Sequence, residues 1–189
     1  MKPTRTQAFE LFKKYNDDSY LTVHALSVEA VMRHFASLNG EDEDKWGIIG
    51  LLHDLDFGKY PDEHCKKVKE ILEEENYDEE YIHAIVSHGF GLCSDVKPEN
   101  NMEWTLFTID ELTGLIYASA LMRPSKSIMD MPVKSVKKKF KDKKFAAGVD
   151  REVILKGAEE LGKDMDYIIE HTLEGMRTVA DDIGLGIHE

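Results

Sequence analysis

The chain has 189 residues, of which 42% are hydrophobic and 32% are charged, a composition typical of a globular protein large enough to bury its own core. No apolar run approaches the roughly 20 residues of a membrane-spanning helix, so no such helix and no membrane partner are expected. The net charge of −13 disfavours binding to duplex nucleic acid, because that polyanion favours broad positive surfaces.

Helix signals dominate the whole chain, and strand signals are nearly absent. Apolar residues recur at helical spacing, with capping residues such as the run Asn16-Asp17-Asp18-Ser19 or Asp150 before a segment and Asn39-Gly40 or Gly162 after it. The predicted helices cover residues 6–15, 20–38, 42–54, 62–75, 78–88, 102–122, 150–161 and 164–182. We therefore expect an all-α fold, with residues 1–189 forming a single-domain helical bundle in which C-terminal helices within 133–183 pack on the segment 20–122.

A basic strip lies between the sixth predicted helix and the last two. Residues 123–144 include nine Lys or Arg against Asp130 and Asp142, a local net charge of +7 in a chain of −13. Such a strip is compatible with a site for an anionic small molecule or with packing against an acidic neighbour. The commoner explanation is the solvated face of a lysine-rich helix.

The two cysteines, Cys65 and Cys93, have no CxxC or other zinc-ribbon spacing. We predict that they are reduced thiols in a reducing compartment, with a secreted protein that has few disulfides as the alternative. The first residues lead into an amphipathic segment that is unlike a secretory signal. A cytoplasmic location is therefore expected.

The most informative motif is His53-Asp54, an imidazole and a carboxylate directly after an apolar segment. Both groups are costly to bury alone, and a divalent first-row metal ion would bind both of them. His53 continues the apolar stripe of Trp46 and Ile49, so we expect its ring to face the core. Asp54 follows at the end of the helix, where the chain leaves it.

Two residues on other helices also fall on core-facing stripes. His24 shares a face with Val28 and Val31, and Asp110 follows Leu106 on a strongly apolar helix. A single His in such a place is usually a core histidine that donates to a carbonyl group. A buried carboxylate is rarer unless it is paired, so a shared metal ion explains Asp110 and the histidines together.

His64 and His88 extend this set. His88 shares a stripe with Ile85, whereas His83 lies roughly 140° around the helix at about 100° per residue and is interpreted as a surface or supporting residue. His64 shares its face with Val68. No special role is expected for His34, His171 and His188. The predicted metal ligands are His24, His53, Asp54, His64, His88 and Asp110.

The order of a lone His24, then His53-Asp54, then a distant Asp110 resembles the HD-domain superfamily of metal-dependent phosphohydrolases. Longer strings resemble one HDIG-like branch: LLHDLDFGKYPDEH at residues 51–64, DELTG at 110–114 and RPSKSIMD at 123–130. The similarity extends over nearly the whole chain. It implies an HD-type helical bundle with a divalent metal on the matching residues.

The same resemblance implies an activity. His64 and His88 match the extra histidines of members with two metals, such as the diadenosine-tetraphosphate hydrolases, which implies a dinuclear site bridged by Asp54. The expected reaction is hydrolysis of a nucleotide or other small phosphate ester by a metal-activated water. One or two ions of Fe, Mn, Co, Ni or Zn suit these ligands better than Ca or Mg.

The chain also departs from the pattern of the superfamily. Leu55-Asp56 stands where Ile-Gly is commonest. The Gly-Tyr-Pro signature of cyclic di-GMP phosphodiesterases is missing, which argues against that activity, and so are the long extra domains of the stringent-response enzymes.

Three basic residues are candidates for contacting the phosphate. Lys59 is expected to be catalytic together with Asp54, and Arg123 and Lys126 are expected to bind the substrate. For each of them an exposed salt bridge is the alternative. Two other functions stay open, a non-catalytic metal-binding or regulatory protein and a di-iron oxygenase of the HD type. The oligomeric state also stays open.

Overall fold

The computed structural model describes residues 1–187, and over them it confirms the all-α fold. The described residues form no β-strand, only an isolated bridge between Phe90 and Ser94. None of their helices combines the length and the apolar composition needed to cross a bilayer. In chain order, the elements are α1 (Arg5–Tyr15), α2 (Ser19–Asn39), α3 (Glu43–Leu52), the 3-10 helix η1 (Pro61–Glu63), α4 (Lys66–Glu74), α5 (Glu79–Ser87), α6 (Asn101–Leu121), α7 (Val133–Lys141), α8 (Arg151–Leu161) and α9 (Met165–Arg177).

Several helices begin and end at the predicted capping residues. The Asp18 carboxylate accepts a hydrogen bond from the backbone N–H of Tyr20 at 2.6 Å, and Asp150 caps α8 in the same way. Helices α2 and α8 end at Gly40 and Gly162, whose φ angles are 66° and 63°. Glycine adopts this left-handed conformation without a steric penalty, so both C-termini are set by local sequence.

The largest differences from the predicted helices occur at three places. The expected helix over 62–75 is divided, because η1 ends before His64, Cys65 has a φ of 69° and α4 begins only at Lys66. Helix α7 forms inside the basic strip and buries Val136. Helix α9 ends at Arg177 and turns follow it, where the predicted helix continued to 182. The division before α4 has a tertiary cause, since His64 and Cys65 are both held by partners from other segments.

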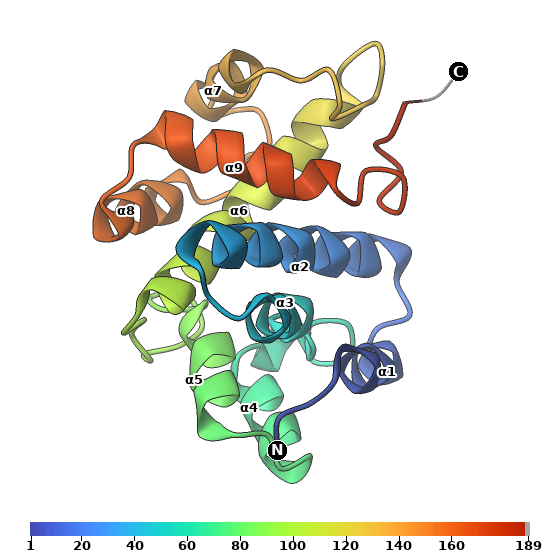
Figure 1. Ribbon diagram of the computed structural model, residues 1–189, viewed down its shortest axis with the longest axis vertical. Helices are drawn as coiled ribbons and strands as arrows, with labels where there is room; N and C mark the ends of the chain where they lie inside the picture. The colour runs from blue at the N-terminus through green and yellow to red at the C-terminus, as the bar shows by residue number, and fades with distance from the viewer. Residues whose placement is uncertain (188–189) are drawn as a thin grey trace.

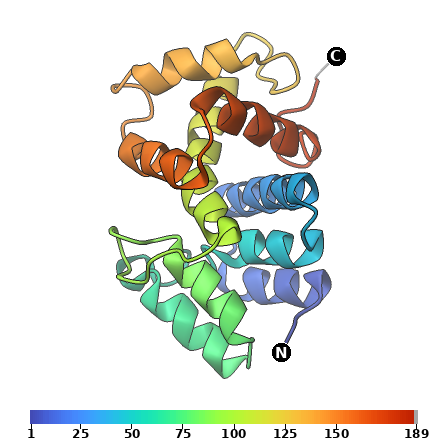
Figure 2. The same ribbon diagram turned by 60° about the vertical axis from the view of Figure 1, so that its left-hand side comes forward.

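Helix α2 lies in the middle of the molecule and packs against α3, α6 and α9. Helices α1, α3, α4 and α5 gather toward one end and α7, α8 and α9 toward the other (Figure 1). Helix α6 runs between the two groups, which is clearest after rotation (Figure 2). Residues far apart in the sequence therefore meet along α2 and α6.

Helices α9 and α2 approach each other closely at Gly175. A Cβ atom at this position would lie only 2.7 Å from the Cα atom of Val31 and 3.3 Å from the carbonyl oxygen of Ala30. Real Cβ atoms do not approach backbone atoms this closely, so a residue without a side chain is needed here. The contact determines how α9 is seated on α2.

Candidate metal centre

A cavity of about 620 Å³ opens between α2, α6 and α8 and the loops that follow α3 and α5. Five of the six predicted metal ligands line it, and the sixth, His53, is completely buried. The five are His24, Asp54, His64, His88 and Asp110. The structure therefore brings together all the residues that helical phase and resemblance selected.

Four of these side chains form a first ligand group, made of His24, His53, Asp54 and Asp110. His24 Nε2 lies 3.2 Å from His53 Nε2 and 2.9 Å from Asp110 Oδ1. His53 Nε2 lies 3.2 Å from Asp54 Oδ2 and 3.3 Å from Asp110 Oδ1. The four residues come from α2, the residues after α3, and α6, so the group exists only in the folded chain.

The other carboxylate oxygen of Asp54 belongs to a second ligand group, which contains Asp54, His64 and His88. Asp54 Oδ1 lies 3.3 Å from His64 Nε2 and 3.6 Å from His88 Nε2, and the two imidazole nitrogens lie 3.3 Å apart. Asp54 thus turns one oxygen toward each group. This arrangement can bridge two ions.

The far sides of three imidazole rings are tied to hydrogen-bond acceptors. His53 Nδ1 lies 2.7 Å from the carbonyl oxygen of Gly50, and His88 Nδ1 contacts the carbonyl oxygen of Ile85. His64 Nδ1 lies 2.7 Å from a carboxylate oxygen of Asp56. With the proton held on Nδ1, each Nε2 lone pair points to the shared centre, which is the usual arrangement of a metal-bound histidine.

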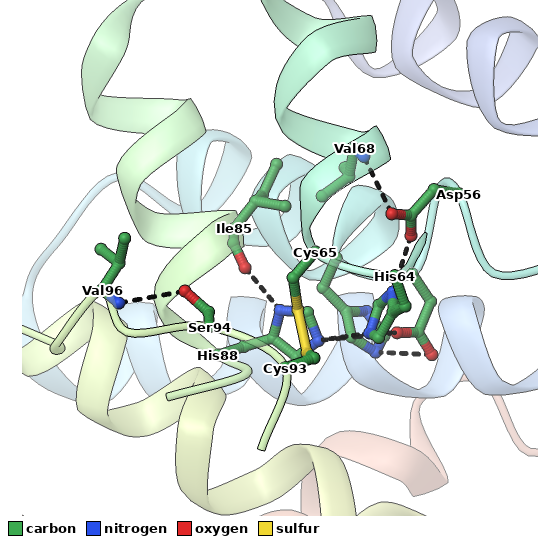
Figure 3. The surroundings of a disulfide bond; sticks show 11 residues. Asp56, His64, Cys65, Val68, Ile85, His88, Cys93, Ser94 and Val96 are labelled. Atoms are coloured by element: carbon green, nitrogen blue, oxygen red, sulfur yellow. Dashed lines mark hydrogen bonds and ion pairs between the residues drawn. A yellow bond between two sulfur atoms is a disulfide. The ribbon is translucent and has the colours of Figure 1, made fainter. Parts of the chain in front are cut away.

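Asp56 belongs to this site, and the sequence interpretation missed it. It is completely buried, and its second oxygen accepts a hydrogen bond from the backbone N–H of Val68 at 2.8 Å, in the first turn of α4. Asp56 therefore orients His64 and caps α4 at once (Figure 3). The departure Leu55-Asp56 was its only sequence signal.

Asn16 holds the segment that follows Asp54. Its buried amide donates to the carbonyl oxygen of Leu55 at 2.8 Å, and its oxygen accepts the backbone N–H of Gly58 at 3.0 Å. The loop is thereby tied to the end of α1. Since Asp54 and Asp56 stand beside these contacts, Asn16 also helps to position both carboxylates.

The ionisable groups of the first ligand group shift one another's pKa. Burial alone would lower the pKa of His53, but Asp54 and Asp110 outweigh this effect and raise the pKa well above its ordinary value. Burial alone would raise the pKa of both carboxyls, yet contact with His53 keeps the pKa of each well below its usual range. Burial and the neighbouring Asp110 raise the pKa of Glu111, on the cavity wall, to about 7.

The donor set fits divalent first-row ions. Imidazole nitrogens and carboxylate oxygens are ligands of Mn, Fe, Co, Ni and Zn. Bonds of about 2.0–2.2 Å to one ion place neighbouring ligand atoms roughly 2.8–3.6 Å apart, at the short end in octahedral and at the long end in tetrahedral geometry. The contacts within the two groups run from 2.9 to 3.6 Å. The His and Asp clusters can therefore hold metal.

The three predicted phosphate-contacting residues do not line this cavity. Lys59 donates a hydrogen bond to the carbonyl oxygen of Lys14 at 2.7 Å and lies over the ring of Tyr15. Arg123 forms an ion pair with Asp130 at 3.0 Å, and Lys126 is exposed. Their proposed contact with substrate is left without geometric support.

The remaining histidines divide in two. His83 stays outside both ligand groups, as predicted, and its Nδ1 lies 2.8 Å from Glu103. His34 and His171, for which no special role was expected, lie 3.0 Å apart. His188 lies outside the described residues.

The structure corrects the expectation of reduced thiols. Cys65 and Cys93 form a disulfide with a Cα–Cα distance of 6.0 Å, within the usual range. A Cβ atom on Gly89 would lie 2.3 Å from the Sγ of Cys93, so glycine leaves room for the sulfur atoms. The bond joins the segment after His64 to the loop after His88 (Figure 3). Sequence spacing could not predict it, because only the fold brings these loops together.

Comparison with known families supports the geometry. The family model described as HD domain matches residues 22–112. No curated protein and no solved structure matches the chain. The matched segment begins just before His24, ends just after Asp110, and contains every residue of both ligand groups. On this match and this ligand arrangement, residues 22–112 form an HD domain.

Proposed function

We propose that this protein is a metal-dependent phosphohydrolase that acts on a nucleotide or another small phosphate ester. The proposal rests above all on Asp54, whose two carboxylate oxygens face separate groups of ligands in one cavity. We infer that the first group holds one ion, that His64 and His88 help to hold a second, and that Asp54 bridges them. Such ions lower the pKa of a bound water and polarise phosphoryl oxygens.

The protein side chains supply orientation in this proposal. Gly50, Ile85 and Asp56 hold the three imidazole rings with Nε2 directed at the centre. Glu111 accepts the backbone N–H of Asp150 at 3.0 Å, which ties the start of α8 to α6 beside the cavity. This contact keeps the opening of the cavity in a fixed position relative to the metal ligands. Little reorganisation is needed when substrate arrives.

The cavity walls favour a substrate with one phosphate and a largely uncharged organic part. No Lys or Arg is among the residues that line the cavity within the described chain. A triphosphate carries more negative charge than the net positive charge of two divalent ions with carboxylate ligands can neutralise. Proteins that bind triphosphates usually contact them with Lys or Arg as well. Aromatic and aliphatic side chains form much of the wall instead: Tyr20, Leu21, Phe57, Leu92, Phe107, Val149 and Val153.

The decisive experiment is metal analysis followed by a phosphatase and nucleotide screen with Mn, Co and Fe. Monophosphate esters are expected to release phosphate faster than the corresponding triphosphates. Asp54→Asn is expected to lower the rate by at least about 1,000-fold, since it removes a ligand shared by both groups. Asp62→Asn makes the same change at an exposed position near the site and is expected to keep the rate.

Three outcomes would contradict the proposal. Bound metal without turnover across a broad panel favours a regulatory metal-binding protein. Iron with consumption of oxygen favours a di-iron oxygenase. Hydrolysis that survives Asp54→Asn places the reaction elsewhere in the molecule.

A further inference from the structure

A second set of metal-ligand side chains lies where α2 meets α9. His34 belongs to α2, and His171 and Glu174 belong to adjacent turns of α9. His34 Nε2 lies 3.0 Å from His171 Nδ1 and 3.2 Å from Glu174 Oε2, and His171 Nδ1 lies 3.0 Å from the same oxygen. The three ligand atoms thus form a nearly equilateral triangle.

Hydrogen bonds cannot satisfy all three contacts when the Glu174 carboxylate carries no proton. Each imidazole nitrogen carries at most one proton, and the carboxylate oxygen carries none. If both nitrogens are protonated, their N–H groups face each other. If only one is, the other nitrogen turns a lone pair toward the carboxylate oxygen. A cation beside these three atoms would accept an electron pair from each of them.

The ligand set and its exposure suit a transition metal. Two imidazole nitrogens and one carboxylate oxygen are common ligands of Zn²⁺ and its first-row neighbours, with bonds of about 2.0–2.2 Å. The side chains of His34, His171 and Glu174 are 22%, 18% and 43% exposed, so water can reach an ion there and complete its coordination. The ring of Tyr167 packs 4.3 Å from that of His171, measured between centroids, and restricts its orientation.

This cluster is separate from the main metal centre, the name used from here on for the two ligand groups that share Asp54. His34 follows His24 by ten positions on α2, which is about 15 Å along the helix axis. None of the three residues lines the main cavity. The HD-domain match ends at residue 112, so His171 and Glu174 lie outside it.

We propose that His34, His171 and Glu174 bind one Zn²⁺, or a similar ion such as Co²⁺ or Ni²⁺, which clamps α9 to α2. His34 and His171 are 137 residues apart in the sequence, so an ion between them binds the folded chain and not the unfolded one. Such an ion stabilises the docking of the C-terminal helices on the HD domain.

The test uses the full chain, stripped of metal with a chelator and then titrated with Zn²⁺. Bound ions are counted and thermal unfolding is followed. His171→Gln is expected to bind one Zn²⁺ fewer per chain than the wild type and to show a smaller rise in melting temperature on addition of Zn²⁺. Glu174→Gln, at the most exposed of the three positions, is a second variant with the same expectation. Diffraction from crystals soaked in Zn²⁺ is expected to show an anomalous peak within the triangle.

His83→Gln is the matched control, because this imidazole also contacts a glutamate, Glu103 at 2.8 Å, but belongs to neither cluster. It is expected to bind as many ions as the wild type. The inference is overturned if the wild type and both variants bind equal numbers of ions. An anomalous map with peaks at the main centre and none at the triangle would overturn it as well.

Discussion

Helix α2 contributes one imidazole to each of two clusters, and these clusters are held in different ways. At the main centre, the Nδ1 atoms of three imidazole rings are hydrogen-bonded to the carbonyl oxygens of Gly50 and Ile85 and to the buried carboxylate of Asp56. At the α2–α9 cluster, His171 is oriented by packing against Tyr167, and all three ligands are partly exposed. The first arrangement depends on buried hydrogen-bond partners, and the second on how one helix is seated on another.

This difference matters for what each cluster can do. Ligands fixed by backbone carbonyls keep their directions when substrate arrives, which suits a reacting centre. Ligands on two helices respond to movement of either helix, which suits a clamp. Changes to a buried partner should therefore affect the main centre alone, and changes to helix seating should affect the α2–α9 cluster first.

Among the variants that test this difference, the largest effect is expected from Asp56→Asn. The amide can still accept one hydrogen bond, but its NH₂ group faces a second donor, so either His64 or the N–H of Val68 loses its partner. We expect binding of one of the two ions at the main centre to weaken about 10–100-fold. Calorimetric titration with Zn²⁺ in a His171→Gln background isolates the main centre and measures this change.

The same titration with intact His171 sharpens the comparison. Binding at the α2–α9 cluster is expected to keep its affinity in Asp56→Asn, and Asp62→Asn is expected to change neither cluster. If Asp56→Asn binds both ions as tightly as the wild type, the buried carboxylate does not orient His64, and the contrast between the two clusters fails.

A smaller effect is expected from Gly175→Ala. The new Cβ atom would lie 2.7 Å from the Cα atom of Val31, so α9 must shift away from α2. Overpacking of this kind costs about 1–3 kcal/mol in the free energy of unfolding, which urea titration measures. The shift also separates His171 and Glu174 from His34, so Zn²⁺ binding at the α2–α9 cluster should weaken while the main centre keeps its ions.

Gly114→Ala is the control for this substitution. A Cβ atom there would meet no atom within 4 Å, and the residue lies inside α6. Alanine is favoured over glycine in a helix by up to about 1 kcal/mol, so this variant should be slightly more stable than the wild type. Equal stability of Gly175→Ala and the wild type would show that the close approach of α9 to α2 is not required.

The sequence predicted what depends on a single helix, and little of what depends on how helices meet. His24 and Asp110 could be predicted because the apolar stripe of each residue's own helix indicates which side of that helix faces the core. His34 lies off that stripe, and its partners are 137 and 140 positions away, so no local pattern pointed to them. The Cys65–Cys93 bond was not predicted for the same reason, because no local pattern connects the two loops that carry these cysteines.

Asp56 escaped for a different reason. A carboxylate two residues after the end of a predicted helix, here the one over 42–54, is usually solvated. Only the fold shows that the ring of His64 and the backbone N–H of Val68 at the start of α4 both contact the Asp56 carboxylate. The same two contacts explain why the predicted helix over 62–75 was too long. Residues that position others were invisible to a search for ligands, because their signal is burial and not residue type.

The smallest effect is expected from Lys59→Met. Its ammonium group already donates to the carbonyl oxygen of Lys14, at 2.7 Å, and lies over Tyr15, so it ties the loop after Asp54 to the end of α1 without lining the cavity. An exposed contact of this kind is worth within about 0.5 kcal/mol, so the rate of phosphate release should change less than about threefold. Lys69→Met makes the same change on α4 and controls for lost charge. If Lys59→Met alone lowers the rate a hundredfold, the loop must carry this lysine to the phosphate during turnover, and the main centre would then be less preorganised than its buried anchors indicate.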